Sequence, residues 1–208
     1  MIILRADFLR SATEPAGYPE ASAPEVAFCG RSNVGKSSCL NVLAQRKHLA
    51  RVSNTPGRTR LINFFELGVA ERTRSGERGP EKVIRLVDLP GYGFAKGPRS
   101  EKEQWKEMIE RYLTQRAPLR AFVVLVDGEI GPQPTDVEMV RWVESLGQKP
   151  IVVATKIDRL SRQRRAAAVQ KAAKVLAVPE AALIAFSAKE HTGVDELWRT
   201  VLDRAGIL

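Results

Sequence analysis

The sequence predicts an α/β domain with a doubly wound, mostly parallel sheet and helices on both faces. The chain has 208 residues, which fits one domain of ordinary size. Short apolar runs alternate along it with longer amphipathic stretches, and a glycine-rich loop follows the first buried run. Nearly continuous short apolar runs are typical of strands buried on both faces of a parallel sheet. Alternation with helices then predicts right-handed crossovers.

Six apolar runs predict a six-stranded sheet. Five of them are expected to be buried and parallel: residues 26–29, 83–89, 121–127, 151–155 and 182–186. The sixth run, residues 61–68, is joined to 83–89 by a polar segment that contains glycine. We expect these two runs to pair as a hairpin, with the sixth as one antiparallel strand at the edge of the sheet.

Five longer stretches predict the helices. They cover residues 36–45, 100–116, 135–146, 161–176 and 194–205. In the second, Trp105, Ile109 and Tyr112 recur at helical spacing, which favours core packing over a platform for base stacking. Ser161 can cap the fourth helix, and Gly206 can end the fifth.

Residues 1–24 are expected to form an irregular lead-in, and residues 25–208 the folded domain. Residues 11–24 are rich in proline, alanine and serine. No apolar run approaches the ~20 residues that span a bilayer, so no integral membrane segment is expected. Cys29 and Cys39 are too few for a disulfide framework, which indicates reduced thiols in a cytoplasmic protein. No feature demands more than a monomer.

A phosphate-binding loop follows the first buried strand. Its residues are Gly30, Arg31, Ser32, Asn33, Val34, Gly35, Lys36, Ser37 and Ser38. They match the pattern G-x-x-x-x-G-K-S between a strand and a helix, which aims backbone N–H groups at phosphate oxygens. Lys36 would reach the β- and γ-phosphates as a candidate catalytic residue, and Ser37 would ligate Mg²⁺. We therefore predict a nucleoside triphosphate site.

Three further segments follow buried strands, where open α/β sheets bind their ligands. They are Asp88, Leu89, Pro90 and Gly91; Thr155, Lys156, Ile157 and Asp158; and Phe186, Ser187 and Ala188. Asp88 would hold Mg²⁺ through water, and the Gly91 N–H would contact a γ-phosphate, which makes Gly91 a candidate catalytic residue.

Asp158 indicates which base is bound. Guanine presents two adjacent donors, N1–H and the N2 amine, which match one carboxylate, whereas adenine presents an acceptor at N1. Lys156 could lie along the base, and the Ala188 N–H could donate to guanine O6. The predicted ligand is GTP or GDP, and Asp158 argues against a P-loop ATPase or nucleotide kinase.

These motifs resemble those of the TRAFAC class of GTPases and, within it, the EngB family of bacterial ribosome-assembly GTPases. The resemblance is carried by GRSNVGKSS, NTPGRTRLINFF, DLPGYGFA, TKID and FSAK, and it covers nearly the whole chain. It implies a Ras-like P-loop GTPase domain over residues 25–208 and slow hydrolysis of GTP to GDP. It also implies association with the large ribosomal subunit and its rRNA during assembly, and a requirement for normal cell division and septation.

The resemblance implies roles for the segment before residue 62. Nucleotide contacts would extend over Gly57, Arg58, Thr59, Arg60 and Leu61. Thr59 would join Ser37 on Mg²⁺ and act as a third candidate catalytic residue. Residues 47–60 and 91–100 would form two switches that GTP orders.

Three positions depart from the common pattern or extend it. Thr155 stands where many GTPases carry asparagine, which predicts a weaker brace to the phosphate loop. Tyr92 stands where Ras-like enzymes carry a water-orienting glutamine, which predicts slow hydrolysis. Asn33 matches a position that coordinates K⁺ in related GTPases, although an asparagine there can instead brace its own backbone.

The chain is basic, with 33 Lys and Arg against 24 Asp and Glu and a net charge of +9. Residues 46–60 contain no acid, and their basic side chains are candidate RNA contacts: Arg46, Lys47, Arg51, Arg58 and Arg60. Such a segment favours an anionic partner, nucleic acid before a membrane surface. A second basic stretch, at residues 162–174, is interpreted as a solvated helix face. The main alternative function is a nucleotide-gated rRNA- or ribosome-binding module whose hydrolysis is incidental.

Overall fold

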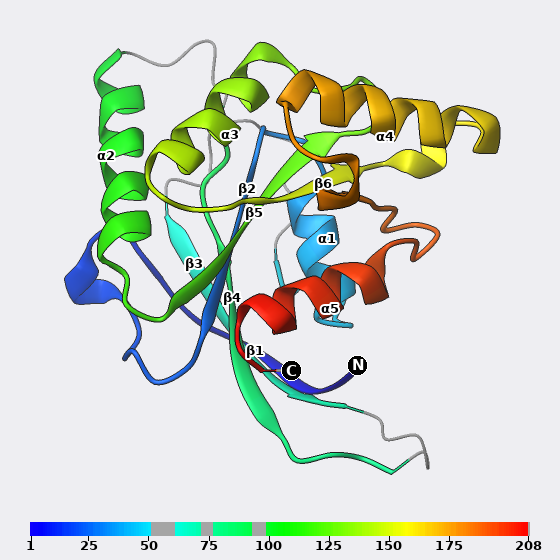
Figure 1. Ribbon diagram of the computed structural model, residues 1–208. Coiled ribbons are helices and arrows are strands. Elements are labelled where there is room, and N and C mark those ends of the chain that lie inside the picture. The colour runs from blue at the N-terminus through cyan, green and yellow to red at the C-terminus, as the bar shows by residue number, and fades with distance from the viewer. Residues whose placement is uncertain (51–60, 72–76, 93–98, 208) are drawn as a thin grey trace.

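The computed structural model describes residues 1–50, 61–71, 77–92 and 99–207. Within them the chain forms one seven-stranded sheet with helices on both faces (Figure 1). The strands are β1 Ile2–Ala12, β2 Glu25–Gly30, β3 Ile62–Ala70, β4 Lys82–Asp88, β5 Leu119–Asp127, β6 Ile151–Thr155 and β7 Leu183–Ala185. The α-helices are α1 Lys36–Leu43, α2 Arg99–Gln115, α3 Pro134–Ser145, α4 Arg162–Leu176 and α5 Val194–Arg204. Every predicted helix and strand is present, and its ends lie within two residues of those predicted.

The strand order across the sheet is β1-β3-β4-β2-β5-β6-β7. The five strands from β4 to β7 in this order are parallel, β3 pairs antiparallel with β4, and β1 pairs antiparallel with β3. The sheet is therefore mostly parallel, as predicted, and β3 forms the expected antiparallel hairpin with β4. β3 is not at the edge, because β1 covers it.

The N-terminal segment differs from the prediction. Residues 1–24 were expected to be irregular and six strands were expected, but Ile2–Ala12 forms a seventh strand at the edge. Register shifts between Ile3 and Arg5 and between Phe8 and Arg10 place one extra residue of β1 at each point. Each bulge moves the following side chains to the other face, so the strand lacks the strict alternation that would identify it in the sequence.

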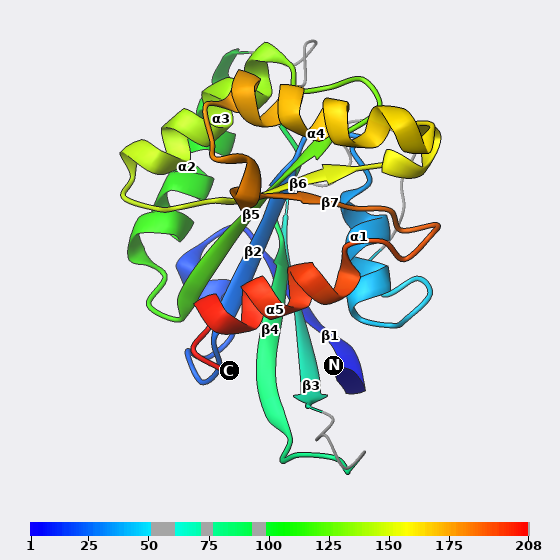
Figure 2. The same ribbon diagram turned by 45° about the vertical axis from the view of Figure 1, so that its right-hand side comes forward.

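The strands separate two hydrophobic cores, since successive side chains of a strand point to opposite faces. In β2, Val26 and Phe28 face α1 and α5, whereas Ala27 and Cys29 face the other core. Figure 2 shows α1 and α5 on one face of the sheet and α2 and α3 on the other. Side chains of α4 belong to the same core as those of α2 and α3.

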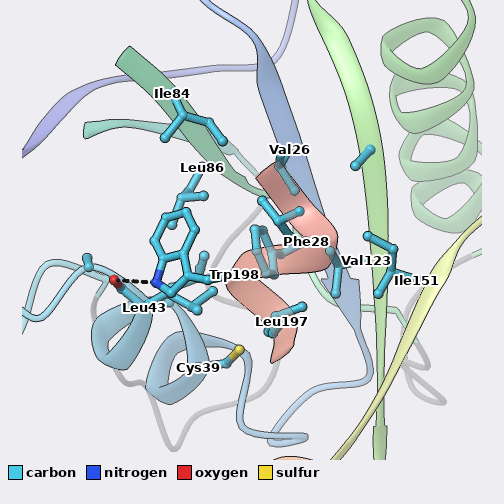
Figure 3. Close-up of a cluster of buried hydrophobic side chains, with 14 of the residues drawn as sticks. Val26, Phe28, Cys39, Leu43, Ile84, Leu86, Val123, Ile151, Leu197 and Trp198 are labelled. Carbon is cyan, nitrogen blue, oxygen red and sulfur yellow. Dashed lines mark hydrogen bonds between the residues drawn. The ribbon is translucent and has the colours of Figure 1, made fainter. Parts of the chain in front are cut away.

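One helix contact connects the first core with the phosphate loop. Trp198 of α5 is 3% exposed, and its indole N–H donates to the Leu43 carbonyl at 3.3 Å, at the end of α1 (Figure 3). Helix α1 begins directly after the loop, so α5 helps to fix the helix that supports it.

Cys29 and Cys39 are both buried and free, one in each core. Within the described ranges, the model contains no helix that combines the length and apolar character needed to cross a bilayer.

Candidate nucleotide-binding site

The candidate site lies at the carboxyl ends of the parallel strands. Residues 30–38, 88–91, 155–158 and 186–188 follow β2, β4, β6 and β7 respectively. Because these strands are parallel, their carboxyl ends meet at one edge of the sheet. The structure thus brings together four segments that are far apart in the sequence, and direct contacts join them.

The phosphate loop uses two glycines for different reasons. Gly35 has a φ of 103°, in the left-handed region, and precedes the first residue of α1. A Cβ on Gly30 would lie 2.8 Å from the Val34 Cγ1 atom and 3.0 Å from the Leu125 carbonyl, so a side chain does not fit there. The loop therefore folds tightly back on β2 and presents the positive end of the α1 dipole.

Lys36 and Asp88 form an ion pair between α1 and the end of β4. The Lys36 ammonium donates to the Asp88 Oδ1 atom. The two side chains are 12% and 8% exposed, so each charge is largely withdrawn from water and compensated by the other. The groups assigned from the sequence to phosphate and to Mg²⁺ are therefore neighbours. Asp88 and the Ser37 hydroxyl offer hard oxygen atoms, the donor type that Mg²⁺ prefers.

The segment after Asp88 runs beside the phosphate loop. The Tyr92 N–H donates to the Gly30 carbonyl at 3.2 Å, and the Ser32 N–H donates to the Tyr92 carbonyl at 3.4 Å. A Cβ on Gly91 would lie 3.1 Å from the Gly30 carbonyl oxygen. Only glycine permits this close approach of the two backbones without a shift.

The Tyr92 side chain points away from this backbone contact into the protein. It is 6% exposed, and its hydroxyl donates to the Asp136 Oδ1 atom of α3 at 2.8 Å. Burial raises the pKa of Tyr92 far above its ordinary value, so the hydroxyl keeps its proton. The hydroxyl is therefore engaged with Asp136.

Thr155 and Lys156 brace the phosphate loop from β6. The Thr155 Oγ1 atom lies 2.6 Å from the Val34 carbonyl and 3.0 Å from the Val126 carbonyl, and it has one proton to donate. The Lys156 ammonium donates to the Asn33 carbonyl at 2.7 Å. The loop is thus held at two successive carbonyls.

Asp158 is oriented by the segment after β7. Its Oδ1 atom accepts a hydrogen bond of 2.7 Å from the hydroxyl of Ser187, which is fully buried. The Ser187 hydroxyl accepts in turn from the Glu190 N–H at 3.0 Å. The carboxylate predicted to select guanine is therefore held in place next to Ala188, the predicted O6 donor.

Comparisons with known proteins agree with this architecture. A family model described as "50S ribosome-binding GTPase" matches residues 25–156. The probable GTP-binding protein EngB of Myxococcus xanthus is 46% identical over 205 residues, which cover 98% of this chain and 96% of the relative. The chain belongs to the EngB family. It is therefore a GTP-binding protein and a GTPase.

Other EngB relatives and several solved structures are similar as well. The probable EngB protein of Anaeromyxobacter sp. (strain K) is 46% identical over 196 residues, 94% of this chain and 89% of the relative. A crystal structure of a probable GTP-binding protein engB shares the fold, with a TM-score of 0.61 and 23% identity over 87% of this chain and 98% of that chain.

Two solved structures of Era are also similar to this EngB-family chain. Aquifex aeolicus Era bound to GDP.AlF4⁻ has a TM-score of 0.66 and 26% identity, over 88% of this chain and 56% of that chain. A structure of Era in complex with MgGDPNP and nucleotides 1506–1542 of 16S ribosomal RNA has the same TM-score and coverage, with 25% identity.

Asp127 belongs to this EngB-family site but was not among the predicted residues. It ends β5; its Oδ2 atom accepts from Lys156 at 2.7 Å, and its Oδ1 atom accepts from the N–H groups of Glu129 and Ile130. Like Asp88, it is the last residue of a buried strand. This position in the sequence could have identified it as a site residue. A cavity of about 140 Å³ opens here, and its lining residues are Arg31, Ser32, Asn33, Val34, Asp127, Ile130 and Lys156.

Asn33 has an unusual backbone position in the phosphate loop. Its φ is 65°, a left-handed conformation that asparagine tolerates, and its carbonyl accepts from Lys156. The K⁺ role remains a prediction.

Several predicted site residues lie outside the described ranges: Arg51, Gly57, Arg58, Thr59 and Arg60. Leu61, Arg46 and Lys47 are described, and all three are exposed.

Proposed function

We propose that this chain is a GTP-dependent switch that hydrolyses GTP slowly to GDP and acts in assembly of the large ribosomal subunit. We further propose that normal cell division and septation need it, and that it is a cytoplasmic monomer in a bacterium. The observation that carries the nucleotide part is the convergence of four segments at one edge of the sheet. Each segment supplies a group that suits a different part of GTP.

The phosphate end of the nucleotide would bind residues 30–38, with Lys36 on the β- and γ-phosphates and the Gly91 N–H on the γ-phosphate. Ser37, Thr59 and, through water, Asp88 would hold Mg²⁺, which neutralises charge on the phosphate oxygens. The contact between Lys36 and Asp88 supports this, since it places a cation and a carboxylate at one point of the loop.

The guanine would bind at the carboxyl ends of β6 and β7. Asp158 would accept from N1–H and the N2 amine, the Ala188 N–H would donate to O6, and the stem of Lys156 would lie along the ring. The hydrogen bond from Ser187 supports this role, because it fixes one carboxylate oxygen of Asp158.

Slow hydrolysis is supported by the environment of Tyr92. A phenol that donates to Asp136 and is 6% exposed does not orient a water molecule beside a γ-phosphate. The orienting group would then come from the switch segments, from a K⁺ ion near Asn33 or from the partner. A ribosomal particle that supplies such a group would accelerate turnover.

A ribosomal partner is supported by three observations. The matched family is described as a 50S ribosome-binding GTPase, and one similar Era structure contains ribosomal RNA. Arg46 and Lys47 are exposed at the start of the acid-free segment. Phosphate contacts from this segment would supply most of the affinity for rRNA.

Competition for bound GDP tests the nucleotide assignment. We expect GTP to displace a fluorescent GDP analogue and ATP to leave it bound. Asp158→Asn should weaken GDP binding at least about tenfold, because it replaces one acceptor for the guanine donors with a donor. Displacement by ATP, or an unchanged affinity in the variant, would overturn the assignment.

Binding to precursors of the large subunit at rising salt tests the partner. We expect tighter binding with a non-hydrolysable GTP analogue than with GDP, and a salt dependence that weakens when Arg46 and Lys47 are both changed to alanine. The slope should fall by about 0.7–0.9 for each RNA phosphate that these side chains neutralise in the unaltered chain. Arg164→Ala with Lys171→Ala on exposed positions of α4 is the matched control and should leave the slope unchanged.

Turnover separates the switch from its alternative. A GTPase rate that rises on adding the particles, or on exchanging Na⁺ for K⁺, supports the switch. A rate that neither addition changes, combined with nucleotide-dependent binding, supports a nucleotide-gated binding module with incidental hydrolysis.

A further inference from the structure

Residues 90–92, which follow β4, are held by contacts on two sides of their backbone. Toward the phosphate loop, the Tyr92 N–H donates to the Gly30 carbonyl and the Tyr92 carbonyl accepts from the Ser32 N–H. Toward α2, the Pro90 carbonyl accepts from the indole N–H of Trp105 at 3.0 Å. The Trp105 ring also meets the Tyr92 ring edge-on, with the centroids 6.3 Å apart.

A third contact holds the same segment through a side chain. The Tyr92 hydroxyl donates to the Asp136 Oδ1 atom at 2.8 Å. Asp136 is itself fixed, because it is 1% exposed and its Oδ2 atom accepts from the Gln133 N–H at 2.7 Å, at the start of α3. The hydroxyl is thus attached to the first turn of a helix that packs on the sheet.

Gly91 lies in the middle of this anchored segment. A Cβ there would approach the Gly30 carbonyl oxygen to 3.1 Å and the Ser32 nitrogen to 3.4 Å, so the two backbones are in close contact. The position of the Gly91 N–H relative to the phosphate loop therefore depends on where Tyr92 is held.

We propose that Asp136 is a positioning residue that, through Tyr92, sets the place of the Gly91 N–H and with it the preference for GTP over GDP. This inference rests on the proposed function, which assigns that N–H to the γ-phosphate. Without the hydrogen bond from the hydroxyl, residues 90–92 can shift relative to the phosphate loop. The interaction with the γ-phosphate weakens, whereas the α- and β-phosphates keep the N–H groups of residues 30–38. A shift of residues 90–92 therefore changes the affinity for a ligand with a γ-phosphate and leaves the affinity for GDP nearly unchanged.

The chain contains a matched control for this contact. Tyr112 is also fully enclosed, and its hydroxyl donates at 2.8 Å to the Glu25 Oε2 atom. Glu25 begins β2, at the end of the strands opposite the nucleotide site. Tyr112→Phe therefore removes the same kind of hydrogen bond from a buried carboxylate without touching residues 90–92.

The test compares the dissociation constants of GDP and of a non-hydrolysable GTP analogue, with Mg²⁺, in the full chain and three variants. We expect Tyr92→Phe to weaken binding of the analogue by about fivefold, the cost of one buried hydrogen bond, and to change GDP binding less than about twofold. Asp136→Asn should also weaken binding of the analogue more than binding of GDP. It provides an independent measurement if Tyr92→Phe folds poorly. Tyr112→Phe should lower the unfolding midpoint and leave the ratio of the two constants unchanged.

A second readout separates positioning from catalysis. Because the hydroxyl acts only through the position of the Gly91 N–H, Tyr92→Phe should raise KM for GTP, and any fall in kcat should accompany that rise. Equal losses for both nucleotides, an equal shift of the ratio in Tyr112→Phe, or a lowered kcat with unchanged KM would each overturn the inference.

The proposed function can fail separately from the inference. If the unaltered chain binds neither nucleotide, the proposed function is wrong and the inference with it. If it binds both, and the variants leave their ratio unchanged, the inference alone is wrong.

Discussion

Two buried carboxylates at opposite ends of neighbouring strands have different surroundings. Glu25, the first residue of β2, is fully buried, accepts hydrogen bonds from Tyr112 and Arg116, and lies 3.7 Å from Arg85. Asp88, the last residue of β4, is also buried and, in the described part of the chain, pairs with one cation, Lys36.

The two arginines that contact Glu25 have further partners. Arg85 also donates to Glu66 at 3.1 Å and to the Ser22 hydroxyl at 2.9 Å, and Arg116 donates to the Pro19 carbonyl. These charges form a closed network in which each member has several partners. Such a network stabilises the fold, and every member is costly to remove.

The carboxyl end of the sheet is arranged differently. In the described part of the chain, the Lys36 ammonium pairs with Asp88 and the Asp158 carboxylate accepts from Ser187, although Asp127 and Lys156 have two or more partners each. A group with one partner can exchange that partner for a ligand at small cost, whereas a group with three partners cannot. The difference predicts that changes at the amino end affect stability and that changes at the carboxyl end affect binding.

The largest effect is expected at Glu25. Glu25→Ala leaves two largely buried arginines without their shared carboxylate and should lower the free energy of unfolding by about 3–5 kcal/mol. Urea denaturation measures it, with the exposed Glu20 changed to alanine as control, expected within about 0.5 kcal/mol of the unaltered chain. A loss at Glu25 as small as that of the control would contradict the closed network.

The second effect is expected at Asp88, and on binding. In Asp88→Asn the amide oxygen still accepts from Lys36, but the largely buried ammonium loses its countercharge, so the free energy of unfolding should fall by about 1–3 kcal/mol, less than at Glu25. The affinity for GTP in Mg²⁺ should fall at least about tenfold, because the carboxylate charge is removed. Isothermal titration calorimetry measures the affinity, and urea denaturation measures the stability. A variant that loses stability but not affinity would contradict the proposed difference between Asp88 and Glu25.

The fold was predictable where its signals are local. The five buried strands are short apolar runs, and the phosphate loop is a contiguous pattern, so both follow from neighbouring residues. β1 was missed because two bulges and the charged residues Arg5 and Asp7 interrupt its pattern. Its place depends on a partner, β3, about fifty residues away, and such a partner leaves no mark in the local sequence.

The candidate site divides in the same way. Its main segments were predicted because each follows a strand end, but the partners that orient them were not. Asp136 reaches Tyr92 across 44 residues of sequence, and Lys156 reaches Asp127 across 29. These pairings depend on which strands lie next to each other, and the strand order was not predicted.

The third effect concerns Thr155, which braces the phosphate loop. Thr155→Val removes the hydroxyl that lies 2.6 Å from the Val34 carbonyl and should cost about 1 kcal/mol of unfolding free energy, with a few-fold loss of GDP affinity. Thr155→Asn introduces the residue common in other GTPases and should restore or raise the affinity. An unchanged affinity and stability in the valine variant would show that the loop is not braced through this side chain, and an equal loss in the asparagine variant would show that asparagine does not replace the hydroxyl here.

The smallest effect concerns pH and returns to the amino end. Burial opposes the charge of Glu66, but hydrogen bonds from Arg5 and Arg85 outweigh it and lower the pKa of Glu66 below its ordinary 4.5. A lowered pKa means that the folded state favours the ionised form. Its contribution is complete above about pH 4.5 and is lost as the pH falls through the lower pKa of the folded state.

Unfolding midpoints measured between neutral pH and pH 3 test this. Glu66→Gln should flatten the acid limb of the stability curve, and the change should stay below about 1 kcal/mol because the group is partly solvated. If the variant shows the same acid limb as the unaltered chain, ionisation of Glu66 does not contribute to the pH dependence of stability.

The pairing of β1 also determines where the chain can be labelled or immobilised without affecting the nucleotide site. Ile2 lies opposite Ala70 and Ala12 opposite Ile62, so the N-terminus is at the end of the sheet far from Asp88. The Ile207 carbonyl accepts from Lys82 at the start of β4, so Ile2 and Ile207 lie at the same end of the sheet (Figure 1). An affinity tag, a fluorophore or a surface tether on either terminus therefore projects away from the nucleotide, so immobilised or labelled protein suits measurements of nucleotide binding.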